Sequence, residues 1–392
     1  MTVPQKNSSS KIWNDPVFRG RVFQGVVLTA IIAFFAFIVS NTLHNLEVRG
    51  ISTGFGFLNQ EAGFGIIQSL IDYNETNTYG RTFVVGILNT LLVSLVGIVL
   101  ATLLGFLMGI ARLSNNWLIS KLAATYIETF RNIPLLLQIF FWYFAVLGVM
   151  PHPRESMSWG ELVFLNVRGL YIPSPEFSDG ITFVYASIFV TLIGIWILKR
   201  WAHKQQDDTG KQFPVFYTAI AALIIIPGIT YLISGTTTTW DVPALRGFNF
   251  KGGITILPEF TALLLALTIY TAAFIAEIVR AGIQSVPKGQ LEASRALGLK
   301  NGQMLRLVVI PQAMRVIIPP LTSQYLNLVK NSSLATAIGY PDLVAIFAGT
   351  TLNQSGQAIE IIFMVMAVYL TISLVISLIM NIYNKRMALV ER

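Results

Sequence analysis

Long runs of apolar residues alternate with shorter polar segments over the whole chain. A helix needs about 20 mostly apolar residues to cross a bilayer, and it satisfies its own backbone hydrogen bonds there. The pattern therefore predicts an all-α polytopic membrane protein with about eight transmembrane helices. The expected crossings are Val22–Leu43, Thr82–Ala111, Leu122–Met150, Gly180–Leu198, Pro214–Ser234, Pro258–Gly282, Val308–Gly349 and Glu360–Tyr383.

The seventh crossing is the least regular of the set. Proline removes a backbone donor and disturbs a helix. The prolines of this stretch are Pro311, Pro319, Pro320 and Pro341. We therefore expect one crossing with re-entrant parts, and we expect Pro311 to restart the chain toward the membrane.

The composition agrees with a membrane protein. Hydrophobic residues make up 54% of the 392 residues and charged residues only 12%, which excludes disorder and makes a single soluble globule implausible. The chain has no cysteine and three histidines, too few for a zinc cluster. No metal site is expected.

The net charge of +8 could suggest nucleic acid as a partner. However, the basic residues lie in loops between apolar runs, as in 199–211 and 280–306, and we expect no nucleic acid partner. Most of them fall on the side of the N-terminus in the eight-crossing topology. Positive charge concentrates in cytoplasmic loops, so both termini are expected in the cytoplasm.

One cytoplasmic loop of this topology has an unusual concentration of small residues. Its sequence runs through Glu292, Ala293, Ser294, Gly298 and Leu299. Small residues can form a short helix with little steric bulk, and Gly298 can turn the chain after it. Such a helix could present a knob to a soluble partner, or it could be a solvated amphipathic connector.

This loop resembles the EAA loop of ABC importer permeases, because Glu292-Ala293 is followed by Gly298 and then by Val308-Val309-Ile310-Pro311. Three further segments, in the right order, resemble the polar amino acid uptake branch of that family. They are Glu128-Thr129-Phe130-Arg131-Asn132-Ile133-Pro134, Ala276-Glu277-Ile278-Val279-Arg280-Ala281-Gly282 and Lys330-Asn331-Ser332-Ser333-Leu334. Ser294 departs from the motif, where a second alanine is common.

The resemblance implies a type I ABC importer permease core with an extra N-terminal helix and a two-helix insertion. This layout is similar to the long permease subunit of general L-amino acid importers. The implied parts are 1–80 (cytoplasmic N-terminus, anchor helix and external loop), 81–150 (first part of the core), 151–257 (insertion with two membrane helices) and 258–392 (second part of the core, with the coupling loop 283–311).

The resemblance also implies the partners. ABC ATPase subunits would dock on Glu292, Ala293, Ser294, Gly298 and Leu299, and they would bind ATP and magnesium. This chain has no GxxxxGK[ST] phosphate loop, so it is expected to be a non-catalytic subunit without a cofactor of its own. The other implied partners are a second, different permease chain, a periplasmic amino acid-binding protein and the amino acid, at a bacterial inner membrane.

Charged and polar residues inside the apolar runs are costly and are candidates for a substrate pathway. Glu277 could meet a substrate ammonium, with Thr271 and Phe274 on the preceding turns, or it could pair with Arg280. Glu128 and Arg131 are expected to form a structural ion pair, since they lie three residues apart.

The remaining candidates for the substrate pathway are polar residues of other predicted crossings. They are Asn89, Gln138, Lys330, Asn331 and Ser332. Hydrogen bonds between helices are the alternative for Asn89 and Gln138. For Lys330 the alternative is a side chain that extends to the outer membrane interface.

Two other classes of function compete with the importer. An ion-coupled secondary amino acid transporter would need a coupling-ion site and usually internal repeats, and neither is evident. A membrane scaffold or receptor would leave Glu277 and the broken stretch Val308–Gly349 without a role.

Overall fold

The computed structural model describes residues 16–48 and 53–387. These residues are mostly helical, and seven of their helices are long and apolar enough to cross a membrane. There are eight crossings if the bent pair Trp117–Asn132 and Leu135–Leu147 forms one span. The all-α membrane class is therefore confirmed. Parts of the expected cytoplasmic termini, 1–15 and 388–392, lie outside the described residues.

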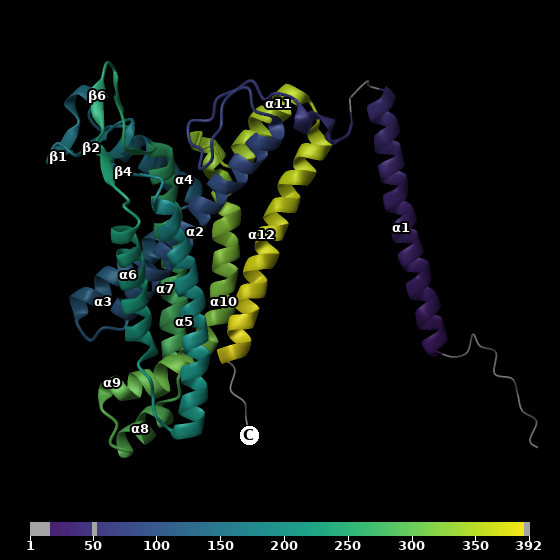
Figure 1. The fold of residues 1–392 in the computed structure, drawn as a ribbon. Coiled ribbons are helices and arrows are strands. Elements are labelled where there is room, and N and C mark those ends of the chain that lie inside the picture. The colour runs from purple at the N-terminus through teal and green to yellow at the C-terminus, as the bar shows by residue number, and fades with distance from the viewer. Residues whose placement is uncertain (1–15, 49–52, 388–392) are drawn as a thin grey trace, which may run out of the picture. The chain divides into compact units, whose positions relative to one another are not determined.

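The long helices follow the order of the expected crossings (Figure 1). They are α1 (Pro16–Val48), α2 (Tyr79–Arg112), α5 (Ile181–Thr209), α6 (Val215–Ile233), α7 (Pro258–Gln284), α10 (Ile310–Asn331) and α12 (Ala358–Met387). The chain forms two compact units, one of Met1–Ser94 with Ile318–Arg392 and the other of Leu95–Ile317. Helices α2 and α10 each contribute residues to both units.

The first unit has its core where α2 meets the segment after α10. Short helical turns form this segment, and they are η6 (Ser332–Ile338), η7 (Val344–Thr351) and α11 (Leu352–Ser355). Leu343 and Phe347 are fully buried there, with Phe57 of the turn η2 (Phe55–Asn59). A Cβ on Gly86 would lie 2.9 Å from the Leu343 Cα, so α2 approaches this segment as closely as glycine allows.

The second unit is organised around α7. A Cβ on Gly105 would lie 2.6 Å from the Ile275 Cβ, and one on Gly109 would lie 2.7 Å from the Ala276 carbonyl oxygen. Small residues at helix contacts are typical of membrane proteins, where close packing replaces the hydrophobic effect. The Tyr126 hydroxyl donates to the Ile269 carbonyl at 2.7 Å and ties a further helix to α7.

The third expected crossing, Leu122–Met150, is wrong as a single helix. The structure divides it into α3 (Trp117–Asn132), α4 (Leu135–Phe140) and the π-helical η3 (Phe141–Leu147), with a bend of 107° after α3. Pro134 causes the break, because the residue before a proline is driven out of the helical region, and Ile133 has φ −94° and ψ 126°. The Gln138 side-chain amide donates to the Phe130 and Ile133 carbonyls and so satisfies two backbone acceptors at the end of α3.

The seventh crossing begins earlier than expected. Its helix starts at Asn301 in α9 (Asn301–Met304), continues through the π-helical η5 (Leu305–Val309) into α10, and spans to Ile338. Pro311 therefore does not restart the chain, because the wider π-helical turn comes directly before it, where the ring needs room. Pro319 and Pro320 lie within α10 without ending it. The helical path ends at Gly339, which has φ +77°.

The insertion 151–257 contains the two expected membrane helices, α5 and α6, which pack against each other. It also contains short strands that the apolar pattern did not indicate. They are β1 (Met157–Trp159), β2 (Val163–Asn166), β3 (Gly169–Ile172), β4 (Ser174–Phe177), β5 (Thr238–Asp241), β6 (Ala244–Arg246), β7 (Asn249–Lys251) and β8 (Ile254–Ile256).

These strands and the turn η4 (Pro153–Glu155) form what we call the β cap. A four-stranded sheet has the order β1-β2-β3-β8, and β4-β5 and β6-β7 form separate antiparallel pairs. The β3–β8 pairing joins the two ends of the insertion, and it is too distant in sequence to be predicted from local patterns. Within the second unit, Figure 1 shows the β cap and α8 (Lys288–Ala296) at opposite ends.

Candidate coupling helix and intramembrane polar residues

Helix α8 is the short helix that the loop sequence predicted. It follows Pro287 and ends at Ala296, and Gly298 then turns the chain with φ +73°. The Gly298 N–H donates to the Arg295 carbonyl at 2.9 Å, and the Leu299 N–H donates to the Ser294 carbonyl at 3.1 Å. These bonds close the helix in the manner of a left-handed glycine cap.

The two sides of α8 differ in exposure. Ser294 is buried, and its hydroxyl donates to the Gln290 carbonyl at 2.6 Å, so this departure from the motif leaves no polar group unsatisfied. Glu292 and Ala293 are exposed, Leu299 is half-buried, and 80% of Leu297 is exposed. Glu292, Ala293 and Leu297 of this loop are therefore accessible in the described chain.

Glu277 pairs with Arg280, the alternative that the sequence had left open. The Arg280 guanidinium donates to both carboxylate oxygens, and its Nη1 also donates to Gln284 Oε1 at 2.7 Å. Arg112 and Arg131 are close enough to interact electrostatically with the same carboxylate. Glu277 therefore lies in a group of arginines and already has a partner within this chain.

The expected ion pair between Glu128 and Arg131 is wrong. The Arg131 guanidinium instead lies over the Phe274 ring, 5.2 Å from its centroid, and Phe274 packs against Tyr270 at 4.9 Å. A cation–π contact with α7 thus replaces the pair along α3. Thr271 is buried, whereas Phe274 is half-buried, so these two candidates have different surroundings.

Asn89 holds separate segments of the first unit together. It is fully buried, and its Nδ2 donates to the carbonyls of Gln68 and Pro341, both at 2.8 Å. The Tyr340 hydroxyl donates to the Asn89 carbonyl at 3.2 Å. Gln138 is likewise buried and bonded across the break after α3. Both residues make the hydrogen bonds between segments that were the alternative to substrate contact.

Lys330 lines a hollow of about 360 Å³ in the first unit. The hollow is lined by Lys330, Ser333, Val344, Val365, Met366 and Tyr369. Lys330 is exposed and forms no ion pair with the residues that the structure describes. Asn331 is half-buried, and Ser332 is fully buried with its hydroxyl donating to the Val329 carbonyl. Of these three candidates, Lys330 has a charge available for a ligand.

Asp342 is a buried acidic residue that the sequence reasoning missed. It is 0% exposed; its Oδ1 accepts from the Ala345 N–H at 2.8 Å, and its Oδ2 accepts from the Tyr369 hydroxyl at 3.2 Å. The neighbouring Leu343 N–H donates to Thr90 Oγ1 at 3.0 Å. An acidic residue directly after Pro341, within the broken crossing, was the signal that could have identified it.

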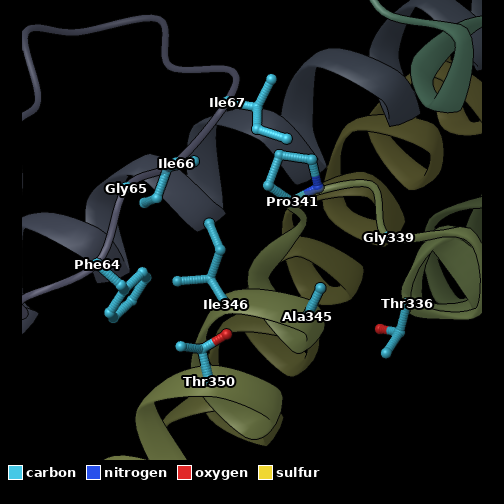
Figure 2. Close-up of a pocket in the computed structure, with 10 residues that line it drawn as sticks. All are labelled: Phe64, Gly65, Ile66, Ile67, Thr336, Gly339, Pro341, Ala345, Ile346 and Thr350. Carbon is cyan, nitrogen blue, oxygen red and sulfur yellow. The ribbon is translucent and has the colours of Figure 1, made fainter.

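A second hollow in the first unit, of about 320 Å³, lies beside the same segment. Figure 2 shows Phe64, Gly65, Ile66 and Ile67 along one side, with Pro341 and Ile346 near them. The other lining residues are Thr336, Gly339, Ala345 and Thr350. None of these side chains is charged, so the hollow has no side chain to neutralise a charged ligand.

Comparison with known proteins identifies the class of this chain. Residues 101–389 match the family described as "Binding-protein-dependent transport system inner membrane component". The chain belongs to this family and is a multi-pass membrane permease. An ion-coupled secondary transporter finds no support in the comparisons.

Three relatives are similar over nearly the whole chain. Escherichia coli (strain K12) YhdX, named as an amino-acid ABC transporter permease protein, is 57% identical, with 96% of each chain covered. The general L-amino acid transport system permease protein AapQ of Rhizobium johnstonii is 53% identical, covering 96% of this chain and 94% of AapQ. BztB of Rhodobacter capsulatus, a permease protein of a glutamate/glutamine/aspartate/asparagine transport system, is 42% identical, with 96% of each covered.

Proposed function

We propose that this chain is the permease subunit of an ABC importer that carries polar L-amino acids across the inner membrane. The names of YhdX, AapQ and BztB support amino acids as the substrate class. The observation that carries the mechanism is α8, a short helix closed by Gly298 with an exposed Leu297. Separate ATPase subunits dock there, bind ATP and magnesium, and drive the transport cycle.

The full importer has further partners on this proposal. A second, different permease chain completes the translocation pathway, and a periplasmic amino acid-binding protein delivers the substrate. Both termini and α8 lie in the cytoplasm, and the β cap lies outside. Within the chain, 81–150 and 258–392 form the permease core, 1–80 adds the anchor helix and an external loop, and 151–257 is the insertion.

Purification of the assembled complex tests this function. The chain is expressed with the ATPase, the second permease chain and the binding protein of its importer, purified through a tag on this chain, and reconstituted into liposomes. We expect an ATPase to co-purify and its ATP hydrolysis to rise with the liganded binding protein. A chain that transports amino acids alone, driven by an ion gradient, would overturn the proposal.

For the substrate site, Lys330 has the strongest support among the candidates. Its ammonium lies beside an apolar hollow and has no anionic partner in the described chain, so a substrate carboxylate can neutralise it. Glu277 could still receive the substrate ammonium, although Arg280 competes for it. Thr271, Phe274, Asn331 and Ser332 remain candidates for the pathway.

Substitution of Lys330 and of Glu277 by the neutral glutamine compares these two candidates. Loss of one charge-assisted contact costs about 1.5–3 kcal/mol, or roughly 10- to 150-fold in affinity. We expect Lys330→Gln to raise the substrate concentration for half-maximal uptake by such a factor, with basal ATPase unchanged. Lys121→Gln, an exposed lysine of α3, is the control. If only Glu277→Gln weakens substrate dependence, the Lys330 assignment is wrong.

A further inference from the structure

The β cap carries an exposed aromatic side chain at a hairpin turn. Phe248 lies between β6 and β7, and 76% of it is exposed. The Arg154 guanidinium lies over its ring, 5.3 Å from the centroid. Arg168 Nη1 donates to the Phe248 carbonyl at 3.2 Å. Two arginines thus hold this turn from the other end of the insertion.

A hollow of about 330 Å³ opens at this turn. It is lined by His152, Pro153, Arg154, Glu155, Arg168 and Phe248. Neither Arg154 nor Arg168 forms an ion pair within residues 16–48 and 53–387. Two guanidiniums beside an exposed ring therefore retain their capacity to pair with carboxylates from outside the chain.

The packing of the β cap fixes this surface in one arrangement. The Phe250 ring lies 4.5 Å from that of Phe164 and 5.0 Å from that of Tyr171. The Tyr171 hydroxyl donates to Asn249 Oδ1 at 2.9 Å, and burial raises the pKa of this tyrosine, so it stays a donor at neutral pH. A preordered surface loses less conformational entropy when a partner binds.

The openness of the hollow favours a protein over a small molecule. Small-molecule sites enclose most of their ligand, whereas Phe248, Arg154 and Arg168 are all exposed. Arginine and aromatic residues are also enriched at protein interfaces. The family description names a binding protein on which transport depends. The β cap is at the end of its unit opposite α8, where such a protein arrives if α8 is cytoplasmic.

We propose that Phe248, Arg154 and Arg168 form a docking point for an acidic surface of the soluble substrate-binding protein. This inference rests on the proposed function, because it requires the β cap to be external. Carboxylates of the binding protein pair with the two guanidiniums, and an apolar group covers the Phe248 ring. The insertion thereby gives this permease a contact that its membrane helices cannot offer.

Titration of the binding protein against the complete importer in liposomes tests this docking point. The readout is the binding-protein concentration that gives half-maximal stimulation of ATP hydrolysis. We expect Arg154→Glu and Phe248→Ala each to raise it roughly tenfold, the effect of removing a central interface residue. Basal hydrolysis and the maximal rate stay unchanged. The half-maximal concentration should depend less on salt in Arg154→Glu than in the wild type.

Arg246→Glu is the matched control, since Arg246 is exposed on the same hairpin but does not line the hollow. An equal shift in this control would mean a general charge effect and would overturn the docking point. An unchanged half-maximal concentration in both test variants would also overturn it. So would stimulation by free amino acid that Arg154→Glu abolishes, because the hollow would then bind a small molecule. Failure of the wild-type complex to respond to any binding protein would reject the proposed function itself.

Discussion

Helices α6 and α7 are similarly apolar, yet they have opposite surroundings. In the apolar 18-residue stretch of α7, 61% of the residues are buried inside the protein. In the corresponding stretch of α6, only 6% are buried. Helix α6 packs mainly on α5, and α7 packs against α3, α4 and η3. Hydropathy therefore predicts that a helix enters the membrane but not whether protein or lipid surrounds it.

The difference follows from side-chain size. The buried face of α7 is rich in alanine, as at Ala266, Ala272 and Ala276, and α2 adds Gly105 and Gly109 at the contact. The surface of α6 carries larger side chains such as Ile224 and Ile226, which are exposed. Since lipid is as apolar as leucine, close packing of small residues decides which helices associate.

The largest expected effect tests this account of packing. Gly109→Leu places a side chain against the Ala276 carbonyl and Val279, where even a Cβ would lie 2.7–2.8 Å away. We expect loss of the folded permease, measured as the amount of membrane-inserted, detergent-stable protein. Gly194→Leu on α5, where nothing lies within 4 Å, is the control and should be neutral. Equal recovery of the two variants would contradict the packing account.

The next largest effect concerns the end of the second unit that carries α8. Gly298→Asp places a charged side chain at φ +73°, in the left-handed region that aspartate tolerates better than most non-glycine residues. It also changes the surface next to the exposed Leu297. We expect amino acid uptake to fall at least tenfold with normal amounts of inserted protein. Gly302→Asp, in an ordinary helical position, should retain uptake, and parallel loss in both would remove the special role of Gly298.

A smaller effect compares two carboxylates that each accept a backbone N–H. Asp342 is fully buried in the first unit, and Asp241 of the β cap is half-buried and accepts from the Gly253 N–H at 2.7 Å. Asp342→Ala leaves the buried Ala345 N–H without its acceptor and removes one partner of the Tyr369 hydroxyl, so it should destabilise the protein by about 1–3 kcal/mol. Asp241→Ala should cost less. Thermal unfolding of the detergent-solubilised complex measures both, and the reverse order would refute the argument from burial.

The smallest effect on transport comes from two cysteines that report orientation. The chain has no native cysteine. Asp208→Cys on α5 and Glu176→Cys on β4 are both at exposed positions. We expect normal uptake from both, and a membrane-impermeant thiol reagent added to intact spheroplasts should label Glu176→Cys alone. Labelling of Asp208→Cys from outside would reverse the proposed topology.

Some features follow from short stretches of sequence. Most of the apolar runs are long enough to span a bilayer by themselves, so α1, α2, α5, α6, α7 and α12 were predictable one at a time. The helix α8 and its turn at Gly298 were predictable for the same reason, since a cap depends on residues within one turn. The motifs around Glu292 and Lys330 also indicated the permease family, which the match over residues 101–389 confirms.

Other features depended on contacts between residues far apart in the chain. Arg131 could have paired with Glu128, but Phe274 of another helix lies within its reach. Strand β3 pairs with β8, although both α5 and α6 lie between these strands in the sequence. Neither strand is long enough to be recognised alone. In a membrane, lipid and protein interior are nearly equivalent solvents for an apolar side chain. The sequence by itself therefore determined which segments enter the bilayer, and only the tertiary structure decided which of them pack together and which polar groups they bring into contact.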